Sequence, residues 1–172
     1  MTPRAAYVHV PFCRRRCGYC NFTVVAARDD LVADYLRAVE LELRQLQKQH
    51  EVDTLFFGGG TPTQMSPAAL DRLCRLAREW FPLAAGYEFS VEANPADLDE
   101  DRLAVLQGAG VNRLSLGGQS FDDRKLEALE RDHRCRQLQR TLDRCRPPFA
   151  SLALDLIFAV PGETLETWAA DL

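Results

Sequence analysis

The sequence lacks three features that would each point to a class of partner: an excess of basic charge, a long apolar run and an apolar leader. Its 172 residues include 21 lysines and arginines against 25 aspartates and glutamates, for a formal net charge of −4, so it shows no footprint for nucleic acid. No apolar run approaches the roughly 18 residues that a membrane span needs, and the N-terminus has no signal segment. We therefore expect a cytoplasmic protein with no nucleic-acid partner and no membrane span.

Cysteine is unevenly distributed, since three of the six cysteines lie in one short loop. Cys13, Cys17 and Cys20 form a C-x3-C-x2-C pattern directly after an apolar run. Thiolate is the usual ligand of iron–sulfur centres, whereas structural zinc needs four ligands and the only nearby fourth candidate is His9. An odd number of thiols and the missing signal segment argue against a disulfide. The pattern favours an iron–sulfur cluster, in which a fourth iron would have no protein ligand.

The remaining cysteines and histidines are assigned no chemistry. Cys74, Cys135 and Cys145 fall on predicted helices, where a free cysteine is usually a small buried apolar residue. His50 and His133 are expected at exposed helix ends. The arginines at 14–16 are either a solvated part of the loop or a counter-charge for the three thiolates.

Apolar strands alternate with amphipathic helices along the whole chain. The predicted strands span residues 5–10, 52–57, 87–93, 112–116 and 151–160. The predicted helices start at Asp30, capped by Asp29 or Asp30, and at Pro67, capped by Ser66, with further helical segments near 103–106, 125–131 and 137–145 and a last helix from about Leu165. This alternation predicts an α/β fold of βαβ units with a parallel sheet.

The unusual polar residues and glycines fall at or just beyond the C-terminal ends of the predicted strands. They are the cysteine loop, the glycines at 58–60, Glu92, Gln119 and Asp155. A βα barrel builds its active site at that end, although a flavodoxin-like open sheet also uses strand C-termini. The position of these residues indicates a barrel-like arrangement with a site at its mouth.

Three of these features have a physical reading of their own. Three glycines in succession exceed what a turn needs, and they permit positive φ and close approach of backbone amides to a ligand. A carboxylate near a strand end in a barrel mouth, as at Glu92, is suited to a cation or a hydroxyl. Asp155 interrupts an apolar strand, so we expect it to be buried and paired.

The lead-in Tyr7-x-His9-x-Pro11-Phe12, followed by the three-cysteine loop, resembles the radical S-adenosylmethionine superfamily. Within that superfamily it resembles the branch of oxygen-independent coproporphyrinogen III oxidase and its heme-chaperone relatives, and the resemblance covers nearly all 172 residues. It implies a partial (β/α) barrel of six strands, of which five are present. Residues 1–172 are therefore expected to be a radical S-adenosylmethionine core domain that lacks the C-terminal part of the family.

The resemblance also implies the cofactors and their ligands. A 4Fe-4S cluster would be held by Cys13, Cys17 and Cys20, and its open iron would be chelated by the amino and carboxylate groups of S-adenosylmethionine. Arg131 is implied as a partner of the carboxylate, although Glu130 stands where the family more often has glycine. The S-adenosylmethionine site implied in this way comprises Tyr7, Tyr19, Gly59, Gly60, Thr61, Glu92, Gln119, Arg131 and Asp155.

Two functions within this branch remain open. One is a radical enzyme, a coproporphyrinogen dehydrogenase-like oxidoreductase that takes a porphyrinogen and needs an electron donor; the other is a chaperone that binds heme and delivers it to an acceptor protein. The oxidases have a further cysteine two positions after the third cluster ligand, where this chain has Phe22. We therefore favour the chaperone branch. A purely structural metal module would not explain Gly59, Glu92, Gln119 and Asp155 together.

Overall fold

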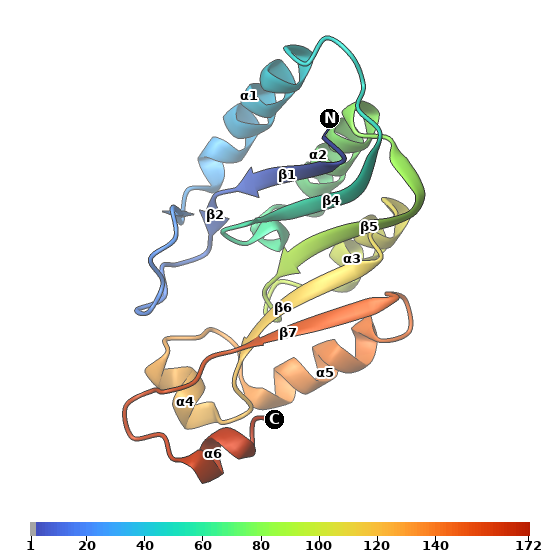
Figure 1. The fold of residues 1–172 in the computed structure, drawn as a ribbon. Helices are drawn as coiled ribbons and strands as arrows, with labels where there is room; N and C mark the ends of the chain where they lie inside the picture. Colours follow the sequence, from blue (N-terminus) through green and yellow to red (C-terminus); the bar gives the residue numbers. More distant parts are fainter. Residues whose placement is uncertain (1–2) are drawn as a thin grey trace.

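Five parallel strands run side by side in the computed structural model, which describes residues 3–172 (Figure 1). Their order in the sheet is the order along the chain: β1 (Ala5–Val10), β4 (Val52–Gly59), β5 (Leu83–Ala93), β6 (Arg113–Gln119) and β7 (Ser151–Leu156). The crossovers contain the helices α1 (Val32–Arg44), α2 (Pro67–Trp80), α3 (Glu100–Gly108), α4 (Asp123–Ala128) and α5 (Cys135–Cys145), and α6 (Leu165–Ala169) follows β7. The parallel sheet confirms what the alternation predicts, and the arrangement is the α/β partial barrel that the family resemblance implies.

The strands and helices form for reasons that the sequence shows directly. Val8 and Val10 alternate with exposed residues on β1 and are buried in the core. Helix α2 begins where predicted, because the Ser66 hydroxyl accepts a hydrogen bond from the Ala69 amide at 3.3 Å and proline follows the cap. The core between sheet and helices contains Leu55, Phe57, Leu70, Leu73, Phe89, Val91, Leu106, Leu114 and Leu116.

A second, small sheet was not predicted. Strand β2 (Phe12–Cys13) pairs in parallel with β3 (Val25–Ala26), so the cysteine loop leaves and returns through two adjacent strands. Figure 1 shows this loop beyond the arrowhead of β1, at the same end of the sheet as the arrowhead of β4. The short sheet therefore fixes both ends of the cysteine loop at the C-terminal edge of the main sheet.

Several predicted boundaries and environments are wrong. Neither Asp29 nor Asp30 caps α1, because a 3₁₀ turn (Asp29–Leu31) precedes the helix and Asp30 pairs with Arg28 instead. Strand β7 ends at Leu156 rather than at residue 160. Beyond it, Ala159 has a φ of +63°, in the left-handed region rather than the extended one.

Two polar residues also have environments that differ from the predicted ones. His133 is fully buried rather than exposed at a helix end. Asp155 is exposed rather than buried, because its carboxylate points from β7 into the cavity at the C-terminal ends of the strands. Within residues 3–172 no helix is long and apolar enough to cross a bilayer.

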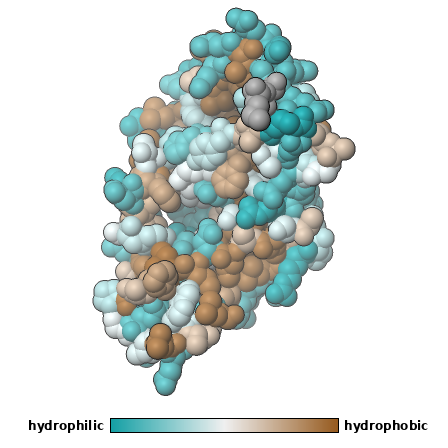
Figure 2. All heavy atoms as spheres, in the orientation of Figure 1, coloured by the Kyte–Doolittle hydropathy of each residue, from teal (hydrophilic) through white to brown (hydrophobic). Residues whose placement is uncertain are grey.

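The last segment is tied to the sheet by a buried ionic cluster. The ammonium of Lys125 pairs with Glu163 and lies 3.0 Å from the carboxylate of Asp171, and it stands 5.0 Å from the ring centre of Trp168. Asp171 in turn accepts hydrogen bonds from the Ser120 hydroxyl at 2.8 Å. The cluster joins the segment around α6 to the start of α4. Figure 2 shows apolar side chains near this end of the molecule, where Phe158 and Leu165 are 69% and 86% exposed.

Replacing Lys125 by methionine should destabilise the fold. The change leaves the carboxylate of Asp171, whose side chain is 2% exposed, buried without its cation, and breaking a buried pair in this way costs about 3 kcal/mol. Arg75→Met is the control, because the ion pair of Arg75 with Asp71 is exposed and should contribute less than about 1 kcal/mol. Urea unfolding of the variants measures both effects. Equal losses of stability would contradict a structural role for the buried cluster.

Candidate functional site

A cavity of about 730 Å³ opens at the C-terminal ends of the strands. Its walls come from the cysteine loop, the turn after β4, and the ends of β5, β6 and β7. The cavity is lined by the predicted residues Cys13, Cys17, Tyr19, Cys20, Gly59, Gly60, Thr61, Glu92, Gln119, Arg131 and Asp155. Cys13 and Asp155, 142 positions apart in the sequence, thus face one space, and the roles of the lining residues toward a ligand stay predictions.

Tyr7 is the predicted residue that does not line this cavity. Its side chain is 58% exposed, its ring stacks on Phe56 with centroids 5.8 Å apart, and its hydroxyl lies 3.2 Å from Nδ1 of His9. The other nitrogen of His9 lies 3.2 Å from the carbonyl oxygen of Thr23. Both nitrogens of His9 therefore have protein partners, which leaves the imidazole poorly placed as a fourth zinc ligand.

The cysteine loop is held by backbone hydrogen bonds at its root and by side chains farther along. The Ala27 amide donates to the Cys13 carbonyl at 3.0 Å, and the Cys20 amide donates to the Cys17 carbonyl at 3.0 Å. The sulfur of Cys13 lies 3.6 Å from the Thr61 hydroxyl. Burial raises the pKa of the Cys13 thiol, against the effect of that hydroxyl. All three thiols are partly exposed and none is in a disulfide.

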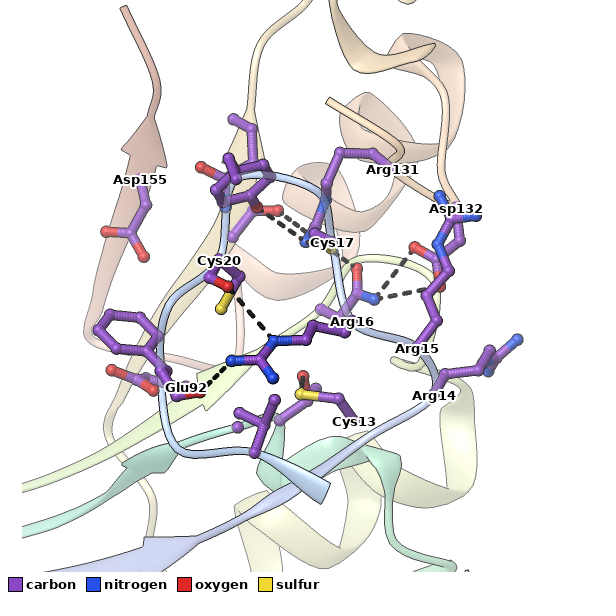
Figure 3. Close-up of a pocket in the computed structure, with 18 of the residues that line it drawn as sticks. Cys13, Arg14, Arg15, Arg16, Cys17, Cys20, Glu92, Arg131, Asp132 and Asp155 are labelled. Carbon is purple, nitrogen blue, oxygen red and sulfur yellow. Dashed lines mark hydrogen bonds between the residues drawn. The ribbon is translucent and has the colours of Figure 1, made fainter. Parts of the chain in front are cut away.

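Arg131 connects the cysteine loop to the main sheet. Its Nη1 lies 3.6 Å from the sulfur of Cys17 and 3.3 Å from the hydroxyl of Tyr19, while its Nη2 donates to the Gly117 carbonyl at 2.8 Å and to the Asn94 side chain at 3.0 Å. Figure 3 shows the guanidinium of Arg131 beside Cys17. The Nε–H is buried and has no hydrogen-bond partner within the described residues. Burial raises the pKa of Tyr19 to about 12.

The unusual residue before Arg131 has a local explanation. Glu130 has a φ of +55°, in the left-handed region that glycine adopts most easily. The conformation is that of a glycine position, which the family resemblance leads one to expect there. Its carboxylate lies against Gly18, where a β-carbon would be 3.2 Å from it. The substitution therefore keeps the backbone path that carries Arg131 into the cavity.

The three arginines of the cysteine loop are all exposed, but two of them also have partners within the protein. Arg14 forms an ion pair with Asp97 at 2.5 Å, and the Asp97 side chain is only 2% exposed. Burial raises the pKa of Asp97. Arg16 reaches the carbonyls of Cys20 and Phe22 at 3.5 and 3.4 Å, and Figure 3 shows its guanidinium inside the loop. Asp97 and Asn94, which follow strand β5, contact arginines around the thiols and were not expected from the sequence pattern.

The glycine turn after β4 packs closely against the backbone that leads into the cysteine loop. The Gly60 amide donates to the Val10 carbonyl at 2.7 Å and the Thr61 amide to the Phe12 carbonyl at 2.7 Å. A β-carbon on Gly60 would lie 2.6 Å from that same Phe12 oxygen. These two amides therefore bind the segment that leads into the cysteine loop, and the role of the glycine turn toward a ligand stays a prediction.

Gly59, which comes just before Gly60, is required for a different reason: its backbone conformation and the closeness of His9. Gly59 has a φ of +114°, and a β-carbon there would lie 2.4 Å from the ring of His9. Its amide donates to a carboxylate oxygen of Glu92 at 2.9 Å. Burial raises the pKa of Glu92, against the effect of this hydrogen bond. The glycine turn thus orients the carboxylate at the bottom of the cavity.

Asp155 has weak contacts within the protein. The Ser115 hydroxyl lies 3.5 Å from both of its carboxylate oxygens. The exposed carboxylate faces the cavity from β7, across from Glu92 on β5. A carboxylate in this state needs no structural partner and is accessible to a polar ligand.

The donor set can be tested against a metal or a cluster. Within residues 3–172, no three His, Cys, Asp or Glu side chains converge on a point where they could share one metal ion. Cys13, Cys17 and Cys20 instead border one cavity, and cluster ligands each bind a different iron. With His9 engaged elsewhere, the donor set fits an iron–sulfur cluster.

These features define an α/β partial barrel with a thiol-lined cavity at the C-terminal ends of its strands. The model of the radical SAM superfamily matches residues 7–172, and the chain belongs to that superfamily. The chain is 40% identical over 168 residues to "Heme chaperone HemW" of Bacillus subtilis, and the match covers 95% of this chain and 44% of that protein. It is 37% identical over 165 residues to an oxygen-independent coproporphyrinogen III oxidase of Bradyrhizobium diazoefficiens, covering 92% and 37% respectively.

The fold agrees with a solved structure. Coproporphyrinogen III oxidase (HemN) from Escherichia coli, described as a radical SAM enzyme, superposes with a TM-score of 0.90 at 34% identity, over 99% of this chain and 40% of that chain. The chain thus spans less than half the length of these relatives.

Gly60→Ala should displace the root of the cysteine loop. The new β-carbon would meet backbone atoms of Pro11 and Phe12, which cannot move aside as a side chain can. We expect less iron and sulfide per chain after anaerobic reconstitution, together with a lower melting temperature. Gly108→Ala is the control, because that glycine ends α3 with open space around it and alanine favours helix. Unchanged iron content in Gly60→Ala would mean that the close approach has no bearing on the loop.

Proposed function

We propose that this chain is the S-adenosylmethionine-binding core of a heme chaperone. Cys13, Cys17 and Cys20 would hold a 4Fe-4S cluster, and the remaining cavity would hold S-adenosylmethionine. The observation that carries the proposal is that the three thiols, the glycine turn and the polar residues at the strand ends all line one cavity. The similarity to HemW of Bacillus subtilis supports the choice of branch.

The cavity offers groups of both charges to a zwitterionic ligand. Glu92 and Asp155 face it with carboxylates, which suit an ammonium group or hydroxyls. Arg131 lines the cavity and would pair its guanidinium with a carboxylate. Gln119 lines the wall at the end of β6. Bound together, the cluster and S-adenosylmethionine supply one-electron chemistry that the protein positions and shields from water.

The second candidate is an oxygen-independent coproporphyrinogen III oxidase. It is favoured by the superposition on the Escherichia coli enzyme. Phe22 favours the chaperone, because it stands in the place of the oxidases' additional cysteine and is 70% exposed at the rim of the cavity. In the chaperone reading, the full-length protein takes heme and an acceptor protein as partners; in either reading it needs an electron donor, and its expected compartment is the cytoplasm.

Anaerobic reconstitution should load about four irons and four sulfides per chain, as the three-thiol cluster requires. Cys17→Ala should abolish this loading, because it removes one ligand. Cys135→Ala removes a thiol on α5, outside the cavity, and should leave the loading unchanged. A metal analysis that returned one zinc per chain and no sulfide would exclude the cluster.

The two functions differ in what the full-length protein does with a tetrapyrrole. We expect the anaerobically purified protein to bind heme in a one-to-one ratio by absorbance titration. We also expect it to leave coproporphyrinogen III unchanged when supplied with S-adenosylmethionine and a chemical reductant. Decarboxylated product, detected by chromatography, would replace the chaperone proposal by the oxidase.

A further inference from the structure

A strained turn at the end of β6 carries Gln119 into the cavity. Gln119 has a φ of +67°, and the Ser120 amide donates a hydrogen bond to the Gly118 carbonyl at 2.9 Å. A hydrogen bond between residues two apart, around a positive central φ, is a γ-turn of the rare and strained form. A residue other than glycine keeps such a conformation only where the surrounding structure holds it.

Two side chains from the segment between α4 and α5 hold the carbonyls that lead into this turn. Arg131 donates to the Gly117 carbonyl at 2.8 Å, and Nε2 of His133 lies 2.9 Å from the Gly118 carbonyl. Because a carbonyl can only accept, Nε2 carries the proton of the imidazole. The His133 side chain is fully buried, and its Nδ1 has no hydrogen-bond partner within residues 3–172. Within the described residues, the imidazole ring thus makes a single hydrogen bond, the one to Gly118.

The far side of the turn is held separately. Asp171 accepts hydrogen bonds from the Ser120 hydroxyl at 2.8 Å and from the Phe121 amide at 2.6 Å. On the near side, the Gly118 carbonyl accepts hydrogen bonds from two donors: the Ser120 amide within the turn and the His133 ring from outside it. Loss of His133 would leave the strained turn anchored after Gln119 but released before it.

The Gln119 side chain depends on this geometry. Its Nε2 lies over Gly117, where a β-carbon would be only 2.9 Å away. Ile157 donates its amide to the Gln119 carbonyl at 3.0 Å, so β7 holds the main chain while the turn sets the direction of the side chain. His133 itself does not line the cavity.

We propose that His133 is a positioning residue for the ligand of the cavity. Its Nε2–H fixes the Gly118 carbonyl, and so maintains the γ-turn that keeps the Gln119 side chain in the cavity wall. The inference rests on the proposed binding of S-adenosylmethionine in this cavity.

Substitution of His133 separates the hydrogen bond from the volume of the ring. His133→Leu fills similar space without a donor, whereas His133→Gln keeps an N–H that can reach the Gly118 carbonyl. In the full-length, cluster-loaded protein, we expect His133→Leu to weaken S-adenosylmethionine binding about tenfold, the effect of one buried hydrogen bond. His133→Gln should restore the dissociation constant to within about threefold of the wild-type value, and equilibrium dialysis measures both.

A matched control removes a similar bond at the other end of the sheet. The Tyr87 hydroxyl donates to the Gly110 carbonyl at 2.9 Å, so Tyr87→Phe also loses one side-chain donor to a backbone carbonyl. This variant should bind S-adenosylmethionine as the wild-type protein does. Equal binding by His133→Leu and wild type, or equal weakening by Tyr87→Phe, would overturn the positioning role.

A double-mutant comparison tests whether His133 affects ligand binding through Gln119. Glycine takes a positive φ without strain, so in a Gln119→Gly background His133→Leu should weaken binding no further, whereas independent effects would add. Additive losses would overturn the proposal. If His133→Leu does not fold, His133→Asn replaces it, because its shorter amide cannot reach the Gly118 carbonyl. A wild-type protein that binds no S-adenosylmethionine would instead refute the proposed function, and the inference with it.

Discussion

The position of the cysteine loop depends on two backbone hydrogen bonds at the glycine turn. The amides of Gly60 and Thr61 bind the carbonyls of Val10 and Phe12, each at 2.7 Å, and they do so only because Gly60 has no β-carbon. These bonds place the end of β4 against the strand that runs into Cys13. The thiols therefore reach the mouth of the barrel through the main chain, and side chains such as Arg131 adjust their orientation afterwards.

The fold and most of the cavity wall could be predicted from the sequence because both follow from periodicity and from strand ends. Parallel strands bring their C-terminal ends to one edge, so Glu92 and Gln119 could be expected near the cysteine loop before any coordinates. Whether a given side chain is buried or exposed could not be predicted in this way, because it depends on how far the sheet curves toward a closed barrel. Asp155 is exposed because β7 forms the edge of the sheet, and His133 is buried because the α4–α5 segment folds back under β6.

The network behind the thiols was missed for a related reason. Asn94 links Arg131 to Asp132, and Asp97 pairs with Arg14 across 83 sequence positions. No local pattern marks such pairs, because each residue has an ordinary place in a loop after β5. The one available signal was their position, because both lie in the short segment between Ala93, which ends the strand that carries Glu92, and α3. A polar residue just past a strand end in this fold can support the site without contacting a ligand.

The anchors of the cysteine loop also set an order of events for the folding chain. Cys13 contacts Thr61, which comes 48 positions later, and Cys17 contacts Arg131, which comes 114 positions later. During synthesis the thiols emerge long before these partners, because the chain leaves the ribosome from its N-terminus. The loop can take its final form only after β4 has paired with β1 and the segment after α4 has docked. The contacts that hold the three thiols are therefore complete only in a chain whose first four βα units have already folded.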